Sequence, residues 1–282
     1  MGGLLLGLIG VGAIAYVGVC LAIWLGQSRL IFHPQSDLAT TPGDIGLTYQ
    51  DVQIPVGGGH LHGWWLPATD DHTQTILFLH GNAGNIAANL RYAGELCQAG
   101  PSILMIDYRG YGLSSGPFPN EARVYEDASA AWRYLTQTQS IAPENIVIFG
   151  HSIGGAIAIE LARYSSKAAG LIVESTFTSM SAMVDYIGYS RIVPKWLLNQ
   201  LFDSEQKLPT LHLPMLLIHG LEDNTVPATM SEQLYAKASG PKKLWLVPGA
   251  NHNDIAEVAG PKYSEFLQRW LASLCPAVEK PI

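Results

Sequence analysis

The chain has 282 residues, a length that suits one large α/β domain or two small ones, and no low-complexity, serine-rich or charge-block linker divides it. The formal net charge of -7 and a charged share of only 14% argue against a general nucleic-acid-binding protein. Cys20, Cys97 and Cys275 stand far apart without a C-x-x-C pair, so they indicate neither a disulfide framework nor a zinc site.

The N-terminal segment differs from the rest of the chain. Leu4–Leu25 contains no charged residue, and at ~1.5 Å per residue it is long enough to span a hydrocarbon core of about 30 Å. A cleaved signal peptide is the alternative, but no Lys or Arg precedes the run, and Trp24 sits where an interfacial anchor would. We expect residues 1–28 to be a retained single-pass anchor. Arg29 follows the run, and the positive-inside rule therefore favours a cytoplasmic position for residues 29–282.

After a connector over residues 29–49, apolar runs alternate with helical patterns. The apolar runs predict two strands within residues 51–68 and further strands over 75–81, 102–108, 145–150, 169–175, 214–220 and 242–249. Patterns with the helical period predict helices over 85–100, 121–138, 153–164 and 255–274. This alternation indicates a mostly parallel central sheet with helices on both faces, in one domain over residues 29–282.

Residues 176–213 are longer than an ordinary loop and carry large apolar side chains, among them Met180, Tyr186 and Trp196. We interpret them as one or two short helices that form a cap over the carboxyl ends of the strands. Open α/β sheets bind their ligands at that edge. The cap is therefore expected to lie beside any site that the strand ends carry.

The pentapeptide GHSIG, residues 150–154, stands between a predicted strand and a predicted helix. A nucleophilic serine needs such a sharp turn, which lifts its hydroxyl clear of the backbone, and glycines on either side remove side chains that would collide. The first amides of the following helix favour developing negative charge. The setting predicts that Ser152 is a nucleophile.

A serine hydroxyl needs a base, and the base needs an orienting acid. The stretches HGLEDNTVP and PGANHND follow two successive predicted strands and supply Asp223 and His252. Alone, each residue would be interpreted as part of a turn or a solvated loop, but the order Ser152, acid, His indicates a catalytic triad. Glu174, at the end of an earlier strand, is an alternative acid. We favour Asp223 because it lies on the loop usual for that role.

Acyl transfer also needs amides that stabilise an oxyanion. The amide of Ile153, just after the nucleophile, is one such donor. The stretch HGNAGN, residues 80–85, follows an earlier strand, and its glycines let backbone amides face a ligand. We favour the amide of Asn82 over that of Ala83 as the second donor.

Other polar residues are interpreted as structural. His60 and His62 alternate on one predicted strand with no acidic or cysteine partner near in sequence, and surface histidines are expected there rather than metal ligands. His151 is expected to pack beside the pocket or form its rim. Asp107 and Arg109 are expected to be a hydrogen-bonded scaffold in a loop beside the site.

The chain resembles the α/β-hydrolase superfamily, and within it the Bem46-like hydrolases, which include ABHD13-like proteins. The matching stretches cover nearly everything after residue 30 and are LHGWWLPA, FLHGNAGN, DYRGYGLSSG, GHSIGG, ESTFTS, FDSEQKL, IHGLEDNTVP and PGANHND. The resemblance implies an α/β-hydrolase fold, with Ser152 as nucleophile, Asp223 as acid and His252 as base. It implies ester or thioester hydrolysis without fixing a substrate. His151 departs from the Arg that relatives often carry there, a difference expected at the pocket rim rather than in the triad.

The sequence therefore predicts a membrane-anchored serine hydrolase of carboxylic esters or thioesters, with a small-molecule, lipid or acylated-protein substrate. No nucleic-acid partner and no metal or organic cofactor are expected. A serine peptidase of the same fold is one alternative, although residues 176–213 offer few groups to hold a substrate amine. A non-catalytic anchored binding module is another, and the complete set of Ser152, Asp223 and His252 argues against it.

Overall fold

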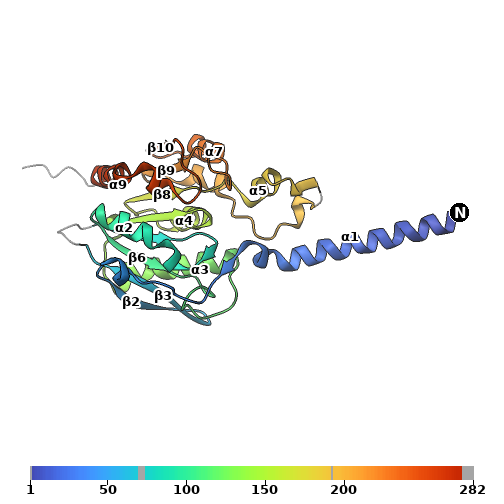
Figure 1. Ribbon diagram of the computed structural model, residues 1–282, viewed down its shortest axis with the longest axis horizontal. Coiled ribbons are helices and arrows are strands. Elements are labelled where there is room, and N and C mark those ends of the chain that lie inside the picture. The colour runs from blue at the N-terminus through green and yellow to red at the C-terminus, as the bar shows by residue number, and fades with distance from the viewer. Residues whose placement is uncertain (1, 69–73, 192, 275–282) are drawn as a thin grey trace, which may run out of the picture.

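The computed structural model describes residues 2–68, 74–191 and 193–274, in which an eight-stranded sheet lies between two layers of helices (Figure 1). Its strands are β2 (Gln50–Val56), β3 (Gly59–Leu66), β4 (Thr75–Leu79), β6 (Ser102–Ile106), β7 (Ile146–His151), β8 (Gly170–Glu174), β9 (Met215–Gly220) and β10 (Lys242–Val247). The order across the sheet is β10-β9-β8-β7-β4-β6-β3-β2. Strand β3 is antiparallel to β2 and β6, and the strands from β6 to β10 run parallel. The predicted mostly parallel sheet is confirmed.

Each face of the sheet is covered by its own set of helices. One layer consists of α3 (Glu121–Arg133), α4 (Ile153–Tyr164) and α7 (Thr229–Lys237), and the other of α2 (Leu90–Gln98), α8 (Ile255–Ala259) and α9 (Pro261–Leu274). In β4, Leu77 and Leu79 pack into the first layer while Ile76 and Phe78 pack into the second. Because successive strand residues point to opposite faces, a strand covered on both sides must be apolar throughout.

Three helices differ from the sequence prediction. The expected helix over 255–274 is broken into α8 and α9 at Gly260, whose φ of +57° suits glycine, and Pro261 supplies no amide to continue the ladder. The expected helix over 85–100 begins with the 3₁₀ turn Ile86–Asn89 before α2, and the one over 121–138 ends in the π turn Tyr134–Thr138 after α3. Helix α7 was not predicted.

The interpretation of His62 as a surface residue is wrong. Its side chain is buried, and its Nε2 lies 2.8 Å from Oδ1 of Asp51 on the neighbouring strand β2. The partner is eleven positions away along the chain and is brought close only by strand pairing. His60 is partly exposed, and its Nδ1 lies 2.8 Å from Oγ of Ser115. Of the cysteines, Cys20 and Cys97 are free thiols, and Cys275 lies outside the described residues.

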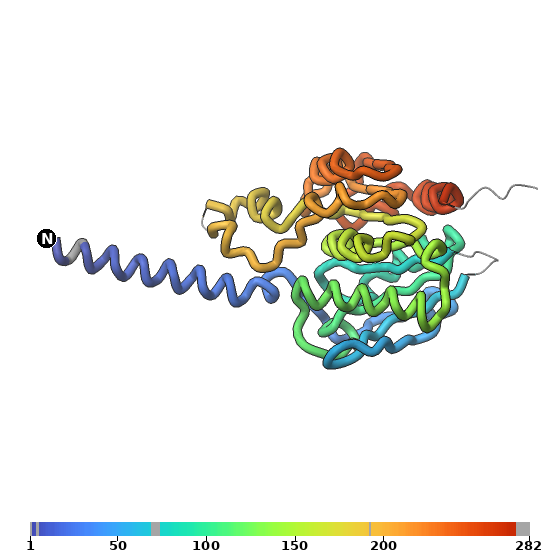
Figure 2. The backbone as a smooth tube through the Cα atoms, turned by 180° about the vertical axis from the view of Figure 1, so that it is seen from behind, coloured from blue at the N-terminus to red at the C-terminus, as the bar shows by residue number. Residues whose placement is uncertain are grey.

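The N-terminal segment is one helix, α1 (Gly2–Ile31), that projects away from the domain (Figure 1, Figure 2). Its part Leu6–Ile31 has a mean hydropathy of 2.4 and is long and apolar enough to cross a membrane, as a signal sequence also can be. The helix extends past the predicted anchor boundary at residue 28. Phe32 then enters the core beside Phe202, so the connector begins as a packed segment.

The connector is also tied to the rest of the domain by a small sheet. Strand β1 (His33–Pro34) pairs in parallel with β5 (Ala83–Gly84), and the 3₁₀ turn Pro42–Ile45 follows before β2. The main-chain amide of His33 donates to the carbonyl of Asn82 at 2.9 Å. The segment that follows α1 thus lies directly against the loop after β4.

The predicted cap contains short helices. Residues 176–213 form α5 (Met180–Tyr186), α6 (Ser204–Lys207) and the 3₁₀ turns Tyr189–Arg191, Lys195–Leu197 and Leu208–Thr210. Ser179 caps α5, because its hydroxyl accepts from the amide of Ala182 at 3.1 Å. In two opposite views, α5 and its neighbouring turns project from the domain on the same side as α1 (Figure 1, Figure 2).

Candidate active site

Ser152 occupies a strained turn between β7 and α4. Its φ is +55° and its ψ is -122°, a backbone conformation that residues with a side chain rarely adopt. The turn needs glycine on both sides: a Cβ on Gly154 would lie 2.0 Å from the carbonyl oxygen of Leu79 in β4, and one on Gly150 would lie 2.1 Å from the carbonyl of Gly154. The GHSIG pattern therefore follows from how closely α4 approaches the sheet.

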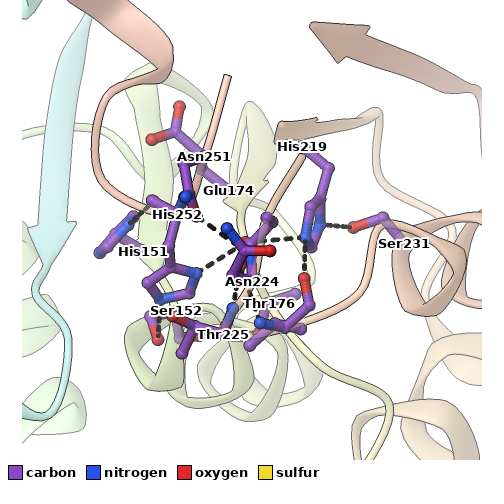
Figure 3. A network of polar contacts seen from close by, with 12 residues as sticks. His151, Ser152, Glu174, Thr176, His219, Asn224, Thr225, Ser231, Asn251 and His252 are labelled. Atoms are coloured by element: carbon purple, nitrogen blue, oxygen red, sulfur yellow. Dashed lines mark hydrogen bonds and ion pairs between the residues drawn. The ribbon is translucent and has the colours of Figure 1, made fainter. Parts of the chain in front are cut away.

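The three predicted triad residues meet at the carboxyl edge of the sheet, in the loops after β7, β9 and β10. Figure 3 shows Ser152 beside His252, with Asn224 and Thr225 close by. The hydroxyl of Ser152 lies 3.0 Å from Nε2 of His252. Nδ1 of His252 lies 2.7 Å from Oδ2 of Asp223. An imidazole protonated at Nδ1 donates to this carboxylate and can accept from the Ser152 hydroxyl at Nε2.

Asp223 is held as a carboxylate. Burial alone would raise its pKa, but hydrogen bonds from His219 and His252 outweigh burial and hold the pKa far below its usual value. The amides of Thr225 and Val226 each donate to Oδ1 at 2.8 Å. The Asp223 side chain is therefore ionised and held in one position by these four donors.

Sequence reasoning missed two residues that support this arrangement. His219 is fully buried, with Nε2 at 3.1 Å from Asp223 Oδ2 and Nδ1 at 2.6 Å from the hydroxyl of Ser231. Asn251 joins the two loops, because its side-chain oxygen accepts from the amides of Asn224 at 3.0 Å and His252 at 2.7 Å. The sequence offered one indication of the contact between His219 and Asp223, which is their separation by four residues. That indication can be used only when the end of β9 is known.

The predicted oxyanion donors lie beside the serine. A Cβ on Gly81 would lie 3.5 Å from Cβ of Ser152, so the loop after β4 runs directly past this serine. Asn82 and Ile153 both line the adjacent cavity. Within the described part of the chain, neither main-chain amide donates a hydrogen bond. The side chain of Asn82 points elsewhere and donates to the carbonyl of Ile31 at 2.8 Å.

A cavity of about 830 Å³ opens over Ser152. Its lining combines the site loops with the cap and with the end of α1. The apolar members are Leu30, Ile31, Ala83, Ala88, Ile153, Phe177, Met180, Met183, Ile187 and Val226. Arg91 is the charged side chain that reaches it, and this residue faces Glu257 at 3.4 Å on its other side.

Glu174, the alternative acid, has a different set of partners. Its carboxyl group accepts from the hydroxyl of Tyr92 at 2.6 Å and from that of Tyr263 at 2.7 Å. Complete burial raises its pKa. The side chain of Glu174 thus bonds to tyrosines of α2 and α9. Its main-chain carbonyl accepts from the amide of Ser152 at 2.8 Å.

The loop after β6 has the scaffold contacts that its sequence suggested. Oδ1 of Asp107 accepts from the amide of Ile86 at 2.8 Å, and Arg109 forms ion pairs of 2.7 Å with Asp127 and Glu126. Over residues 2–68, 74–191 and 193–274, no group of three or more His, Cys, Asp or Glu side chains could hold a metal ion. The polar side chains that line the cavity include those of Ser152 and His252 together with Asn89, Arg91, Tyr92 and Asn253.

Comparison with known proteins places the chain in a family. A family model described as "Serine aminopeptidase, S33" matches residues 70–206. An α/β-hydrolase domain-containing protein of Arabidopsis thaliana, WAV2, is 31% identical over 295 residues, which cover 96% of this chain and 95% of that protein. The chain belongs to the α/β-hydrolase family. Another relative of this α/β hydrolase, the uncharacterized protein Rv2307c of Mycobacterium tuberculosis, is 35% identical over 92% of both chains.

Solved structures show the same fold. The esterase Pf2001 of Pyrococcus furiosus superposes with a TM-score of 0.71 at 20% identity, over 87% of this chain and 98% of that one. An α/β hydrolase of Vibrio vulnificus gives a TM-score of 0.64 at 24% identity, over 83% of each chain. At these identities the likeness establishes the α/β-hydrolase fold alone.

His151 packs directly against His252 in this α/β hydrolase. Its Nε2 donates to the carbonyl of His252 at 3.1 Å, and its ring lies between those of His252 and Tyr92, with centroids 5.3 and 5.2 Å away. Burial, helped by the nearby His252, lowers the pKa of His151 to about 3. The expectation that it packs beside the pocket agrees with this position.

We predict that His151 makes the fold sensitive to acid. The folded chain keeps this imidazole neutral while the unfolded chain protonates it near pH 6.5, so its stability contribution is complete above that pH and is lost as pH falls from about 6.5 toward 3. By pH 5 the loss reaches about 2 kcal/mol. Thermal unfolding is measured at pH 7.5 and at pH 5.0. Between these two values the Tm of the wild type should fall by about 3 °C more than the Tm of His151→Gln.

The control is His212→Gln, which removes an exposed histidine. This variant should keep the wild-type difference in Tm between the two pH values. An equal Tm decrease in His151→Gln and wild type would contradict the prediction.

Proposed function

We propose that this protein is a membrane-anchored serine hydrolase that cleaves carboxylic esters or thioesters through an acyl-enzyme. The observation that carries the proposal is the hydrogen-bonded chain from Ser152 through His252 to Asp223 at the base of a mostly apolar cavity. A serine, a base and a fixed acid in this geometry form the arrangement that activates a hydroxyl for attack on a carbonyl.

In the first half of the reaction, Oγ of Ser152 attacks the carbonyl carbon and its proton passes to Nε2 of His252. The negative charge on the former carbonyl oxygen is stabilised by the amides of Ile153 and Asn82 and by the N-terminus of α4. The bond to the leaving group then breaks, and His252 returns the proton to the departing alkoxide or thiolate. Asp223 stabilises the imidazolium that exists between these two transfers.

In the second half, water replaces the alcohol. His252 takes a proton from the water as its oxygen attacks the acyl carbon, the same amides hold the oxyanion, and the bond to Ser152 breaks as the proton returns to Oγ. The carboxylic acid leaves and the free serine is restored. The chemistry uses residues of this chain and water alone.

The cavity favours an acyl ester over a peptide with a free amino terminus. An aminopeptidase needs an acidic group that pairs with the substrate ammonium, but no Asp or Glu is found among the described residues that line the cavity. The charged side chain there is the cation Arg91, which would repel an ammonium. These contacts support ester or thioester cleavage, although the matching family model carries an aminopeptidase description.

We infer that α1 retains the enzyme in a membrane. Its length and mean hydropathy suit a span, and its last turns are bound to the domain, because Gln27 bonds to Leu197 and Asn199 and the carbonyl of Ile31 accepts from Asn82, contacts that a removable leader would not require. Arg29, directly after the apolar run, favours a cytoplasmic hydrolase domain. Esters of lipids or of acylated proteins are the substrates that such an enzyme would meet.

Ser152→Ala should abolish labelling by a fluorophosphonate probe, because the probe reacts with an activated serine hydroxyl and this variant has none at the site. Labelling is measured by in-gel fluorescence on detergent-solubilised protein, with circular dichroism as the check on folding. Ser239→Ala, an exposed serine, is the control and should label like the wild type. Persistent labelling of the Ser152 variant would exclude it as the nucleophile.

Asp223→Asn should lower ester turnover on the order of thousands-fold, because an amide can neither stabilise imidazolium nor fix the productive tautomer. Glu174→Gln and Glu222→Gln should retain far more activity, since one side chain faces two tyrosines and the other is exposed. The measurement is kcat on p-nitrophenyl butyrate. A larger loss at Glu174 than at Asp223 would move the acid to β8.

The apolar lining should make the enzyme select longer acyl chains. Each buried methylene contributes about 0.8 kcal/mol, so kcat/KM should rise from p-nitrophenyl acetate through the longer esters until the cavity is full. Met183→Trp, which fills part of the cavity, should shift the preferred ester to a shorter chain. A steady fall of kcat/KM beyond acetate in the wild type would contradict acyl-chain binding.

A further inference from the structure

Side-chain hydrogen bonds fasten the cap to helix α1. The amide group of Gln27 is buried, where its nitrogen donates to the carbonyl of Leu197 at 2.7 Å and its oxygen accepts from the amide of Asn199 at 2.8 Å. The side chain of Asn199 in turn donates to the carbonyl of Trp24 at 2.8 Å. The cap is thus fixed beside α1 at the level where the charge-free run ends.

Beyond this junction the cap exposes large apolar side chains. Tyr186, Ile187, Tyr189 and Trp196 are each about half exposed or more, and Trp196 reaches 81%. We call residues 186–191 and 193–196 the cap tip. In water such an exposed apolar group is unfavourable, whereas Trp and Tyr are the side chains that gather at the interface between a bilayer and water. Trp24 of α1, whose carbonyl accepts from Asn199 at the junction, is itself 45% exposed.

The charged residues of the cap tip fit the same position. Lys195 pairs with Asp185, and Arg191 lies three residues beyond Gly188 with its side chain exposed. Cations beside aromatic rings are suited to the headgroup layer, where their charges face phosphates while the rings lie deeper. Figure 1 and Figure 2 show this part of the cap projecting along α1 rather than folding back over the sheet.

The cavity over Ser152 is bounded by the same two elements. Leu30 and Ile31 come from α1, and Met180, Met183 and Ile187 come from α5 and the residue after it. Leu30 and Ile187 both line the cavity and are 64% and 51% exposed, so they form part of its rim. The mouth therefore lies between α1 and the cap tip, where both leave the domain.

We infer that the cap tip inserts into the membrane interface beside α1, and that the cavity takes acyl esters of membrane lipids directly from that leaflet. A lipid chain would pass between Leu30 and Ile187 without entering water, and its ester group would reach Ser152 while the head group stays at the rim. The lipid substrate rests on the proposed hydrolase function, whereas the membrane contact of the cap tip does not.

The first test separates access to an ester held in a membrane from the hydrolysis step itself. Full-length protein in phosphatidylcholine vesicles is given 4-methylumbelliferyl palmitate in the bilayer or the soluble acetate. The double variant Tyr189→Glu/Trp196→Glu should lower palmitate turnover by about fivefold or more, because charges resist insertion, and leave acetate turnover within about twofold. Neither residue lines the cavity.

The control is Tyr164→Glu, which places one such charge on an exposed tyrosine at the end of α4, away from the cap tip. It should match the wild type with both esters. Palmitate turnover by the double variant equal to that of the wild type would overturn the inference.

The second test requires no activity. Tyr189→Cys and, as control, Tyr164→Cys are made in a chain whose Cys20, Cys97 and Cys275 are serine, and each is labelled with a fluorescent dye. In vesicles of lipids with brominated acyl chains, the dye at position 189 should be quenched and the dye at 164 should not. Shielding of position 189 from aqueous iodide without quenching by brominated lipid would indicate a protein cover and overturn the inference.

The two tests fail independently. A wild type that hydrolyses neither ester would contradict the proposed function, and with it the lipid substrate. The dye at position 189 would still decide whether the cap tip contacts the bilayer.

Discussion

The left-handed backbone of Ser152 depends on the close approach of the first turn of α4 to strand β4. That approach leaves no room for a side chain at Gly154, and it holds the serine where its amide donates to the carbonyl of Glu174 and its carbonyl accepts from the hydroxyl of Thr176 at 2.8 Å. A conformation that costs on the order of 1–3 kcal/mol persists because packing and hydrogen bonds on both sides determine it. Every other part of the site is placed relative to this turn.

The parallel sheet brings the remaining groups to the turn. Strands β7, β8, β9 and β10 are neighbours in register, so their carboxyl ends share one edge, and residues a hundred positions apart become hydrogen-bonding partners. Asp223 is surrounded by donors from its own loop, and Asn251 bonds that loop to the one carrying His252. These hydrogen bonds fix the groups relative to one another, and the proposed reaction needs groups that are already in position, because reorganisation would add to its barrier.

The sequence was most informative where one local pattern requires one structure. The apolar runs located the strands, and GHSIG located the turn because few residues other than glycine tolerate its contacts. Asp223 and His252 could be placed because each directly follows a strand in a known order. The resemblance to the α/β-hydrolase superfamily then assigned expected catalytic roles to Ser152, Asp223 and His252.

What sequence reasoning missed depends on contacts between distant segments. The partner of His62 lies on another strand, and the role of His219 appears only once Ser231 of α7 and Asp223 stand on either side of it. The Gly-Pro pair at residues 260–261 indicates the break between α8 and α9. The apolar periodicity on both sides of it favoured one continuous helix, and the prediction followed that periodicity. The docking of α1 depends on Gln27, a polar residue that looks like the end of an apolar run until its partners in the cap are known.

Asn82 belongs to two structures at once. Its main chain passes the nucleophile, while its side chain holds the last turn of α1 through the carbonyl of Ile31, and its own carbonyl accepts from the amide of His33. The helix is therefore not interchangeable with any other apolar segment of equal length. If residues 1–31 were replaced by a different apolar helix, the chain would lose Leu30 and Ile31 from the cavity wall. It would also lose the helix end to which the side chain of Asn82 is hydrogen-bonded. The end of α1 and the wall of the cavity are therefore one structure, and a change in the first alters the second.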